Sequence, residues 1–309
     1  MLGIDSVSAY RRPFHLYPLF QIPLMFLGLF LVLAALFWLL GLGRPPVAVA
    51  IALDLSNSTY GDRFNAPGSV LESEIQAVNA YLDRNTPELL RQPNQVKVLG
   101  FAGVVRPLTE EFANNSEEVK EDLENALRRP GLEKSVIPGS TDLSRAINAG
   151  TDALSSREEC RELLLVTDGQ GDVSPTAIAD ATLNRVKLNS IVIGADAPAL
   201  ALAAVGTGGK YVSGNVNDLE QLFSNRFFGR FNSNLKWLIF WLACAWVALM
   251  WTLVLPFDRI ILQGWRQMPM DMAGKIALGN AYFWTGLTPI IVWRIYKMLD
   301  LALPFLSQC

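Results

Sequence analysis

The chain has 309 residues, of which 51% are hydrophobic and 18% charged, and its formal net charge is −3. This length accommodates one α/β domain of ordinary size together with membrane segments. The stretch 44–230 contains 18 Lys/Arg and 25 Asp/Glu, an acidic balance that argues against a nucleic-acid partner and is compatible with a divalent cation. His15 is the single histidine and lies beside a membrane segment. This argues against a Ser-His-Asp catalytic triad and against a zinc site with histidine ligands.

An uncharged apolar segment follows a short N-terminal tail, residues 1–15. Residues 16–43 contain no Asp, Glu, Lys or Arg, and a membrane-spanning helix needs about 20 apolar residues. A cleavable signal peptide is the alternative, but its apolar core would be about 7–15 residues long and would precede a small-residue cleavage site. The run is longer than that and is followed by GLGRPP, which favours an uncleaved transmembrane helix.

Strands and helices then alternate through residues 44–230. Continuous apolar runs bounded by turn residues predict buried strands, and these lie at VAVAIALDLS (47–56), QVKVLGFAG, VVRPLT, ELLLVTDG (162–169), NSIVIGAD and GKYVS. Apolar residues at helical spacing predict helices near residues 71–82, 117–127, 143–154 and 176–186, in PALALAAVG and in NDLEQLFSNRF. This alternation predicts an α/β fold with a doubly wound, mostly parallel sheet, and such sheets bind ligands at the carboxyl ends of their strands.

Two further apolar segments follow the α/β region. Residues 237–257 carry no Asp, Glu, Lys or Arg, and an all-apolar run of that length predicts a transmembrane helix over residues 235–257. The C-terminal region 258–309 is expected to be membrane-associated, with a candidate third span at residues 276–293. Because that stretch contains Gly279, Asn280 and Pro289, a re-entrant hairpin and a helix lying in the membrane interface stay open as alternatives.

The charges that flank these segments give a weak orientation signal. Five lie at one end of the two spans, namely Arg11, Arg12, Arg259, Arg266 and Lys275. Four lie at the other end, namely Arg44, Arg226, Arg230 and Lys236. Basic residues concentrate on the cytoplasmic side, so the balance slightly favours a multi-pass protein with its α/β domain on the non-cytoplasmic side.

The three cysteines, Cys160, Cys244 and Cys309, match no metal-binding spacing. Cys244 lies in an apolar run and Cys309 is the last residue. We therefore expect no intramolecular disulfide.

Three short motifs fall where the predicted strands end or a helix begins. They are Asp54-Leu55-Ser56-Asn57-Ser58, Gly139-Ser140-Thr141-Asp142 and Thr167-Asp168-Gly169. Each motif alone is weak, because such serines also cap helices and such an aspartate also occupies turns. Alternate positions of an extended segment face one side, and carboxylate and hydroxyl oxygens are hard ligands of the kind that Mg²⁺ prefers. The three motifs in this order predict a metal site.

With these motifs the chain resembles the von Willebrand factor A (VWA) family, which is integrin I-domain-like, over roughly residues 46–227. In that family the corresponding residues surround one divalent cation in a metal-ion-dependent adhesion site (MIDAS). The resemblance implies Mg²⁺, with Mn²⁺ or Ca²⁺ as alternatives, and the metal ligands Asp54, Ser56, Ser58, Thr141 and Asp168. Gly139-Ser140 departs from the family pattern, in which a Gly-Gly pair is common.

The order of span, VWA domain and span resembles the aerotolerance-type (Bat) membrane proteins. Related systems work with MoxR-type AAA ATPases in assembling or maturing other proteins, so the resemblance implies a scaffold or assembly factor. We expect a membrane-anchored protein-binding module that holds a partner's acidic residue through the metal. The alternative is a structural subunit of a larger membrane complex. An enzyme is not expected, because no phosphate loop and no base beside the site are evident.

Overall fold

The computed structural model describes residues 13–60, 64, 67–87, 92–168, 171–194, 196–215, 218–223, 227, 231, 233–299, 301 and 303–305. Most of the tail 1–15 lies outside the described residues. So do several individual residues of the predictions, namely Arg11, Arg12, Gly169, Arg226, Arg230 and Cys309. The chain divides into two compact units, Arg44–Ser233 and a second unit made of Met1–Gly43 with Asn234–Cys309.

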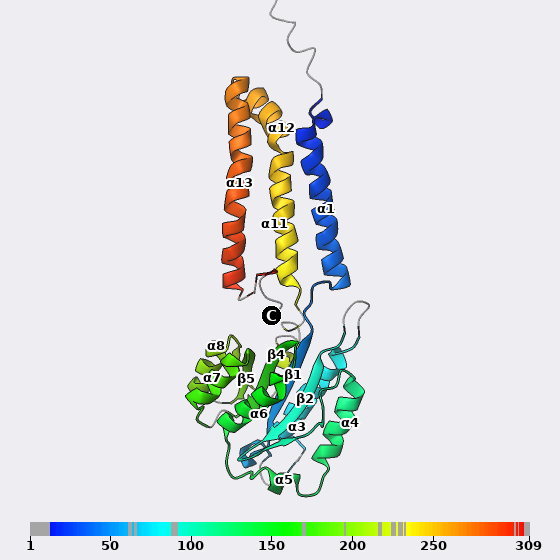
Figure 1. The fold of residues 1–309 in the computed structure, drawn as a ribbon, viewed down its shortest axis with the longest axis vertical. Helices are drawn as coiled ribbons and strands as arrows, with labels where there is room; N and C mark the ends of the chain where they lie inside the picture. Colours follow the sequence, from blue (N-terminus) through cyan, green and yellow to red (C-terminus); the bar gives the residue numbers. More distant parts are fainter. Residues whose placement is uncertain are drawn as a thin grey trace, which may run out of the picture. The chain divides into compact units, whose positions relative to one another are not determined.

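The first unit is built on one six-stranded sheet in the order β3-β2-β1-β4-β5-β6 (Figure 1). Its strands are β1 (Val47–Asp54), β2 (Gln95–Phe101), β3 (Val105–Pro107), β4 (Cys160–Thr167), β5 (Val186–Ile193) and β6 (Tyr211–Gly214). All neighbouring pairs are parallel except β2 and β3, which form an antiparallel hairpin. The predicted doubly wound, mostly parallel sheet is therefore confirmed.

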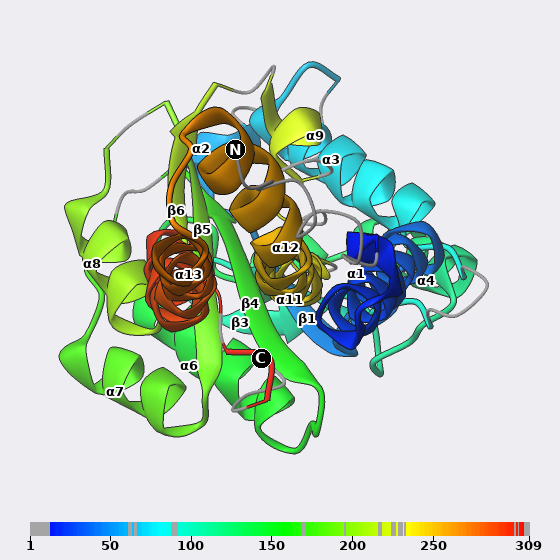
Figure 2. The same cartoon turned by 90° about the horizontal axis from the view of Figure 1, so that it is seen from above.

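Helices cover both faces of this sheet (Figure 2). The bounds are α2 (Asn57–Tyr60), α3 (Val70–Arg84), α4 (Ser116–Leu127), α5 (Leu132–Ser135), α6 (Leu143–Ser155), α7 (Pro175–Leu183), α8 (Pro198–Gly206) and α9 (Leu219–Gln221). The helices predicted near residues 71–82, 117–127, 143–154 and 176–186 agree with α3, α4, α6 and α7 to within a few residues. The six predicted strands agree with β1 to β6 equally well. β5 begins at Val186, three residues before the predicted NSIVIGAD.

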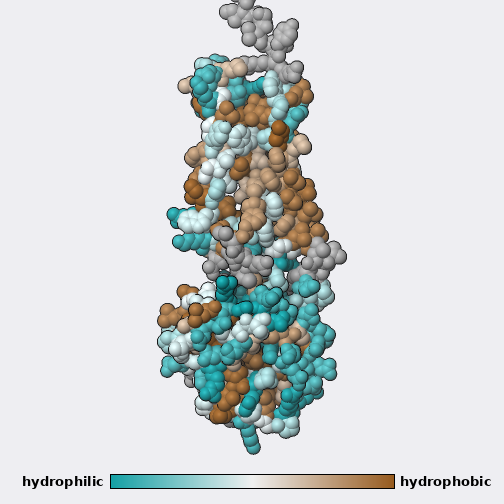
Figure 3. Space-filling model, in the orientation of Figure 1, coloured by the Kyte–Doolittle hydropathy of each residue, from teal (hydrophilic) through white to brown (hydrophobic). Residues whose placement is uncertain are grey.

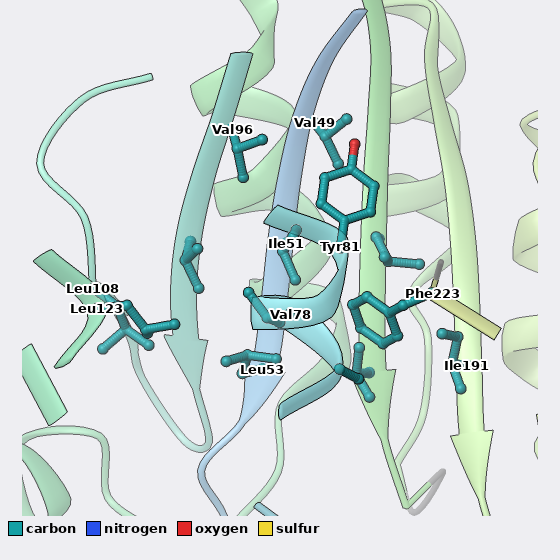
Figure 4. Close-up of a cluster of buried hydrophobic side chains, with 14 of the residues drawn as sticks. Val49, Ile51, Leu53, Val78, Tyr81, Val96, Leu108, Leu123, Ile191 and Phe223 are labelled. Carbon is teal, nitrogen blue, oxygen red and sulfur yellow. The ribbon is translucent and has the colours of Figure 1, made fainter. Parts of the chain in front are cut away.

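The two faces of the sheet have different cores because β1 alternates large and small side chains. Val49, Ile51 and Leu53 pack toward α3, where Val78 and Tyr81 are fully buried (Figure 4). The intervening residues are alanines, Ala48, Ala50 and Ala52, and they belong to the core beneath α6. Small side chains on that face let a helix approach closely, and a β-carbon added at Gly150 of α6 would collide with the Leu163 side chain.

One expectation about the cysteines is wrong. Cys160, the first residue of β4, is disulfide-bonded, whereas Cys244 is free. The sequence argument considered spacing along the chain, and disulfide formation depends on distance in space.

The second unit is helical. It contains η1 (Phe14–Leu16), α1 (Pro18–Leu40), α11 (Leu235–Thr252), α12 (Val254–Pro256), η4 (Phe257–Trp265) and α13 (Met270–Met298). α11 packs against α1 through Phe37 and Trp237, whose ring centroids lie 5.6 Å apart. It also packs against α13, where Trp251 Nε1 donates a hydrogen bond to Thr285 Oγ1 at 3.0 Å. α13 is one continuous helix across residues 276–293, so the structure does not contain the re-entrant hairpin considered there.

Among the described residues, two helices are long and apolar enough to cross a membrane, Pro18–Leu40 and Leu235–Trp265. In the first of them only 6% of the most apolar window is buried, whereas a core helix of a soluble protein would be mostly buried. Figure 3 shows apolar side chains gathered over this helical unit. Met25, Val32 and Leu39 of α1 are among the large apolar residues that are exposed. Exposed apolar surface of this extent indicates membrane association.

We predict that a fragment of residues 45–230 folds on its own, because it contains all six strands and the helices that cover both faces. A single cooperative urea transition followed by circular dichroism is the expected result. A matched fragment ending at residue 156 lacks β4 to β6 and should show no such transition. A gradual, noncooperative loss of signal from the longer fragment would contradict the predicted domain, residues 44–230.

Candidate metal site

The candidate site begins where β1 and β4 end, at a point where the winding of the sheet reverses. The chain passes from β1 to β2 on one side and later crosses to β4 on the other side. Such a switch point opens a crevice at the carboxyl ends of the strands, where ligands of open α/β sheets bind. Asp54 is the last residue of β1 and Thr167 the last residue of β4.

The DxSxS segment turns from β1 into the short helix α2. Asp54 is fully buried, Ser56 is buried, and Ser58 is exposed. The hydroxyl oxygens of Ser56 and Ser58 lie 2.9 Å apart. The structure therefore brings these two predicted ligands together at the carboxyl end of β1, and one of them, Ser58, is accessible to solvent.

Hydrogen bonds fix the Asp54 carboxylate. Its Oδ1 accepts from the Ser56 backbone N–H at 3.0 Å, and its Oδ2 accepts from Thr167 Oγ1 at 2.6 Å. The Thr59 hydroxyl lies 2.9 Å from the Asp54 carbonyl oxygen and 2.8 Å from that of Ser56, to which it donates. The Thr59 and Thr167 hydroxyls and the Ser56 backbone thus hold this candidate metal-binding segment in one conformation.

The environment disfavours a charged Asp54. Burial raises the pKa of its carboxyl from 3.8 to about 6, the charge of Asp168 adds to the rise, and the hydrogen bonds from Thr167 and Ser56 oppose it. A buried carboxylate near a second carboxylate is a group that a cation would stabilise.

The other two predicted ligands lie on neighbouring loops. Asp168 directly follows β4 and is partly buried, and its charge acts on Asp54. Thr141 is partly buried in the loop before α6, where its carbonyl oxygen packs against Gly171. The next residue, Asp142, caps α6 by accepting from the Arg145 N–H at 2.9 Å, and its own N–H donates to the Ala102 carbonyl at 2.9 Å. No contact of the Thr141 hydroxyl with the DxSxS segment is among the interactions found in the described residues.

A buried glutamate that the motif search missed lies close to Asp54 and Asp168. Glu74 of α3 is fully buried, and within the described part of the chain neither of its carboxyl oxygens has a hydrogen-bond partner. Burial raises its pKa well above the usual value, and the charges of Asp54 and Asp168 raise it further, against a smaller opposing effect of the Asp54 backbone. The signal was present in the sequence, because Glu74 stands three residues after Leu71 and four before Val78, on the apolar face of the helix.

The donor set fits a hard cation that retains water. Across the described ranges there is no group of three or more His, Cys, Asp or Glu side chains arranged to hold a metal ion, so any site here depends on hydroxyl and water ligands. Mg²⁺ keeps several waters and takes oxygen ligands at about 2.0–2.1 Å in an octahedron. Ligands at adjacent corners then lie about 2.9 Å apart. The Ser56 and Ser58 hydroxyls share a hydrogen bond at 2.9 Å, so they are already as close as two such ligands would be.

No protein-family model matches the chain, and no curated protein matches it. An aerotolerance-related membrane protein from Bacteroides fragilis is 20% identical with a TM-score of 0.44, over 60% of this chain and 99% of that one. A von Willebrand factor type A protein from Catenulispora acidiphila is 16% identical with a TM-score of 0.48, over 59% and 42%. Proximal thread matrix protein 1 from the mussel byssus, solved with a zinc-occupied MIDAS motif, is 15% identical with a TM-score of 0.43, over 58% and 46%. Structural neighbours thus include a von Willebrand factor type A protein and an aerotolerance-related membrane protein, the two classes that the sequence resembles.

Proposed function

We propose that the α/β domain is a protein-binding module that uses a divalent cation, with Mg²⁺ as the physiological ion, to hold a carboxylate of a partner protein. The observation that carries the proposal is the pair of serine hydroxyls 2.9 Å apart beside a fully buried aspartate whose pKa is raised to about 6. These groups lie at the switch point of the sheet, where a ligand is expected. The zinc-occupied MIDAS of the mussel protein is a property of that protein and agrees with the choice of a divalent ion.

The proposed ligands divide into charged and neutral donors. Asp54 and Asp168 supply carboxylates, and Ser56, Ser58 and Thr141 supply hydroxyls, directly or through water. The bound ion would supply an electrophilic centre for an incoming carboxylate. Five protein donors leave one of the six coordination positions of the ion open, and only two of the five are acids, so the ion still attracts an anion. Because Ser58 is exposed, the open position would face solvent.

The wider role we propose is that of a membrane-anchored scaffold or assembly factor, with no catalytic step. Exposed apolar surface on α1 supports the anchoring. A disulfide at Cys160 supports placing the domain on the non-cytoplasmic side, because disulfides persist in oxidising compartments. An ATPase of the MoxR type needs cytoplasmic ATP, so in that orientation it would meet other parts of the chain and not the metal site. Protease accessibility of the domain in sealed vesicles decides the side.

Capture of partner proteins is expected to require both the metal and Thr141. The full-length protein, immobilised in detergent-solubilised membranes, should release its bound proteins in EDTA and recover them in Mg²⁺. Thr141→Ala should weaken capture about tenfold, an effect of about 1.4 kcal/mol, while the stability of the domain changes little because a loop hydroxyl contributes little to the core. Quantitative mass spectrometry of the eluates measures both effects.

Ser144→Ala provides a matched control, because it removes a nearby hydroxyl that contacts the Asp172 carbonyl oxygen and the Ser174 N–H. Its capture should equal that of the unaltered protein. Capture that persists equally in EDTA and in Thr141→Ala would exclude the metal site as the binding surface. The structural-subunit alternative would then be the better one.

A further inference from the structure

Ile137 has a backbone conformation that its side chain opposes. Its φ is +56°, in the left-handed region, where a β-branched residue is an outlier. It also precedes Pro138, and a residue before proline is restricted toward extended conformations. Holding a residue other than glycine in this region is energetically unfavourable.

The position in the fold explains the φ but not the choice of residue. α5 ends at Ser135 with Val136 as its C-cap, so Ile137 is the next residue, which at many helix ends adopts the left-handed conformation and is usually glycine. Arg185 follows the C-cap of α7 in the same way and also has a positive φ, +55°. A glycine at 137 would satisfy the turn without strain.

The surroundings of Ile137 fix this conformation. Its carbonyl accepts from the Gly103 N–H at 3.2 Å, the preceding Val136 carbonyl accepts from the Val104 N–H at 3.0 Å, and the following Pro138 carbonyl accepts from the Asn57 N–H at 2.9 Å. Val136 is fully buried. The backbone of the loop is therefore held by hydrogen bonds on both sides of Ile137, which fixes the direction of its Cα–Cβ bond.

That position is at the candidate metal site. The Asn57 that holds Pro138 stands between the two ligand serines, and Thr141 follows Ile137 by four residues in the same loop. The Ile137 side chain is 54% exposed, so its burial in the domain contributes only part of what a core isoleucine would. A strained, half-exposed apolar residue beside a candidate site motivates a hypothesis about the function of its side chain.

We propose that Ile137 forms an apolar contact surface beside the metal site and determines which acidic segments bind there. It would do so by contacting an apolar side chain adjacent to the partner's carboxylate. This inference rests on the proposed function. The partner segment it fits is an acidic residue flanked by large apolar residues. Metal–carboxylate contact alone recognises any exposed acid, whereas the additional apolar contact restricts binding to a subset of acidic segments.

The test uses the full-length protein in detergent and two immobilised, end-blocked pentapeptides, one with a central glutamate between leucines and one with a central glutamate between serines. In Mg²⁺ the unaltered protein should prefer the leucine-flanked peptide by about tenfold, the effect of burying roughly half of two aliphatic surfaces. Ile137→Gly should abolish this preference, while Mg²⁺ affinity is unchanged and Tm is unchanged or raised because the strain is relieved. Ile137→Val keeps an apolar β-branched side chain and should retain most of the preference.

Leu183→Asn is the matched control, because Leu183 is 80% exposed and far from the site. It ends α7 just before β5 begins, near the amino ends of the strands, whereas the candidate site lies at their carboxyl ends. It should leave the preference intact. A preference that survives Ile137→Gly would overturn the inference, and so would loss of Mg²⁺ affinity with a lowered Tm in that variant, which would make the side chain structural. Equal Mg²⁺-dependent binding of both peptides by the unaltered protein would overturn the inference and leave the proposed function standing. No Mg²⁺-dependent binding of either peptide would overturn both.

Discussion

Asp54→Asn is expected to lower the affinity for Mg²⁺ at least about a hundredfold, the loss of about 2.7 kcal/mol or more of ion–carboxylate attraction, and to raise the stability of the metal-free domain at neutral pH. The two effects have opposite signs for one reason. A buried carboxylate with its pKa raised to about 6 is unfavourable without a cation and is stabilised by one. The asparagine keeps the shape, and its side-chain oxygen still accepts a hydrogen bond. Isothermal titration with Mg²⁺ and urea unfolding in EDTA measure the two effects.

Asp142→Asn is the control for this prediction. Asp142 is an acid next to Thr141, and its role is to cap α6 through a hydrogen bond from the Arg145 N–H. Asparagine is an equally good N-cap, so the variant removes a charge near the site without removing a proposed ligand. It should bind Mg²⁺ almost as the unaltered protein does. Equal losses of affinity in the two variants would mean that the ion responds to general acidity and not to a site at Asp54.

The fold could be predicted from the sequence because its signals are local. The strands β1 and β4 each contain a continuous apolar run that the sheet buries, and amphipathic spacing marked α3 and α6. Asp54, Ser56 and Ser58 could be predicted for the same reason, since they follow one another along one short segment. Their proximity, with the two hydroxyls 2.9 Å apart, follows from that spacing.

The remainder of the site depends on contacts between distant segments. In the sequence, Thr167 is an ordinary residue at the end of a strand. In the fold, the parallel register of β1 and β4 lets its hydroxyl donate a hydrogen bond to the carboxylate of Asp54, which lies 113 residues earlier. The periodicity of α3 places Glu74 on the apolar face of the helix, but periodicity does not say which residues lie opposite that face. The positive φ of Ile137 arises just after the end of α5, and backbone hydrogen bonds from distant segments to residues 136–138 hold it, which composition does not reveal. The disulfide at Cys160 was missed for the same reason.

The final prediction is that the metal-free domain loses stability as pH rises, the reverse of the usual behaviour of paired surface acids. The pKa of Asp54 is about 6 in the folded protein against 3.8 as its ordinary value. Between those two values the folded state binds more protons than the unfolded state, so the free energy of unfolding falls as pH rises through this window. At about 1.4 kcal/mol per pKa unit the loss is about 3 kcal/mol. Glu74, whose pKa is also raised by burial and by the charges of Asp54 and Asp168, acts with the same sign and extends the fall to higher pH.

Urea unfolding in EDTA at about pH 4.5 and about pH 7.5 captures about 2 kcal/mol of this loss, because the lower pH already lies above the ordinary pKa of the group. The difference between the unaltered protein and Asp54→Asn isolates the contribution of Asp54 from that of all other acids. Mg²⁺ should restore stability at the higher pH, where the carboxylate is charged, and should have little effect at the lower pH, where it is protonated. A difference in the free energy of unfolding between the two proteins that stays constant or rises between these two pH values would show that Asp54 is not held in an environment that disfavours its charge. The case for a cation at the end of β1 would then lose its electrostatic basis, because a carboxylate already stabilised by its neighbours has no need of an ion.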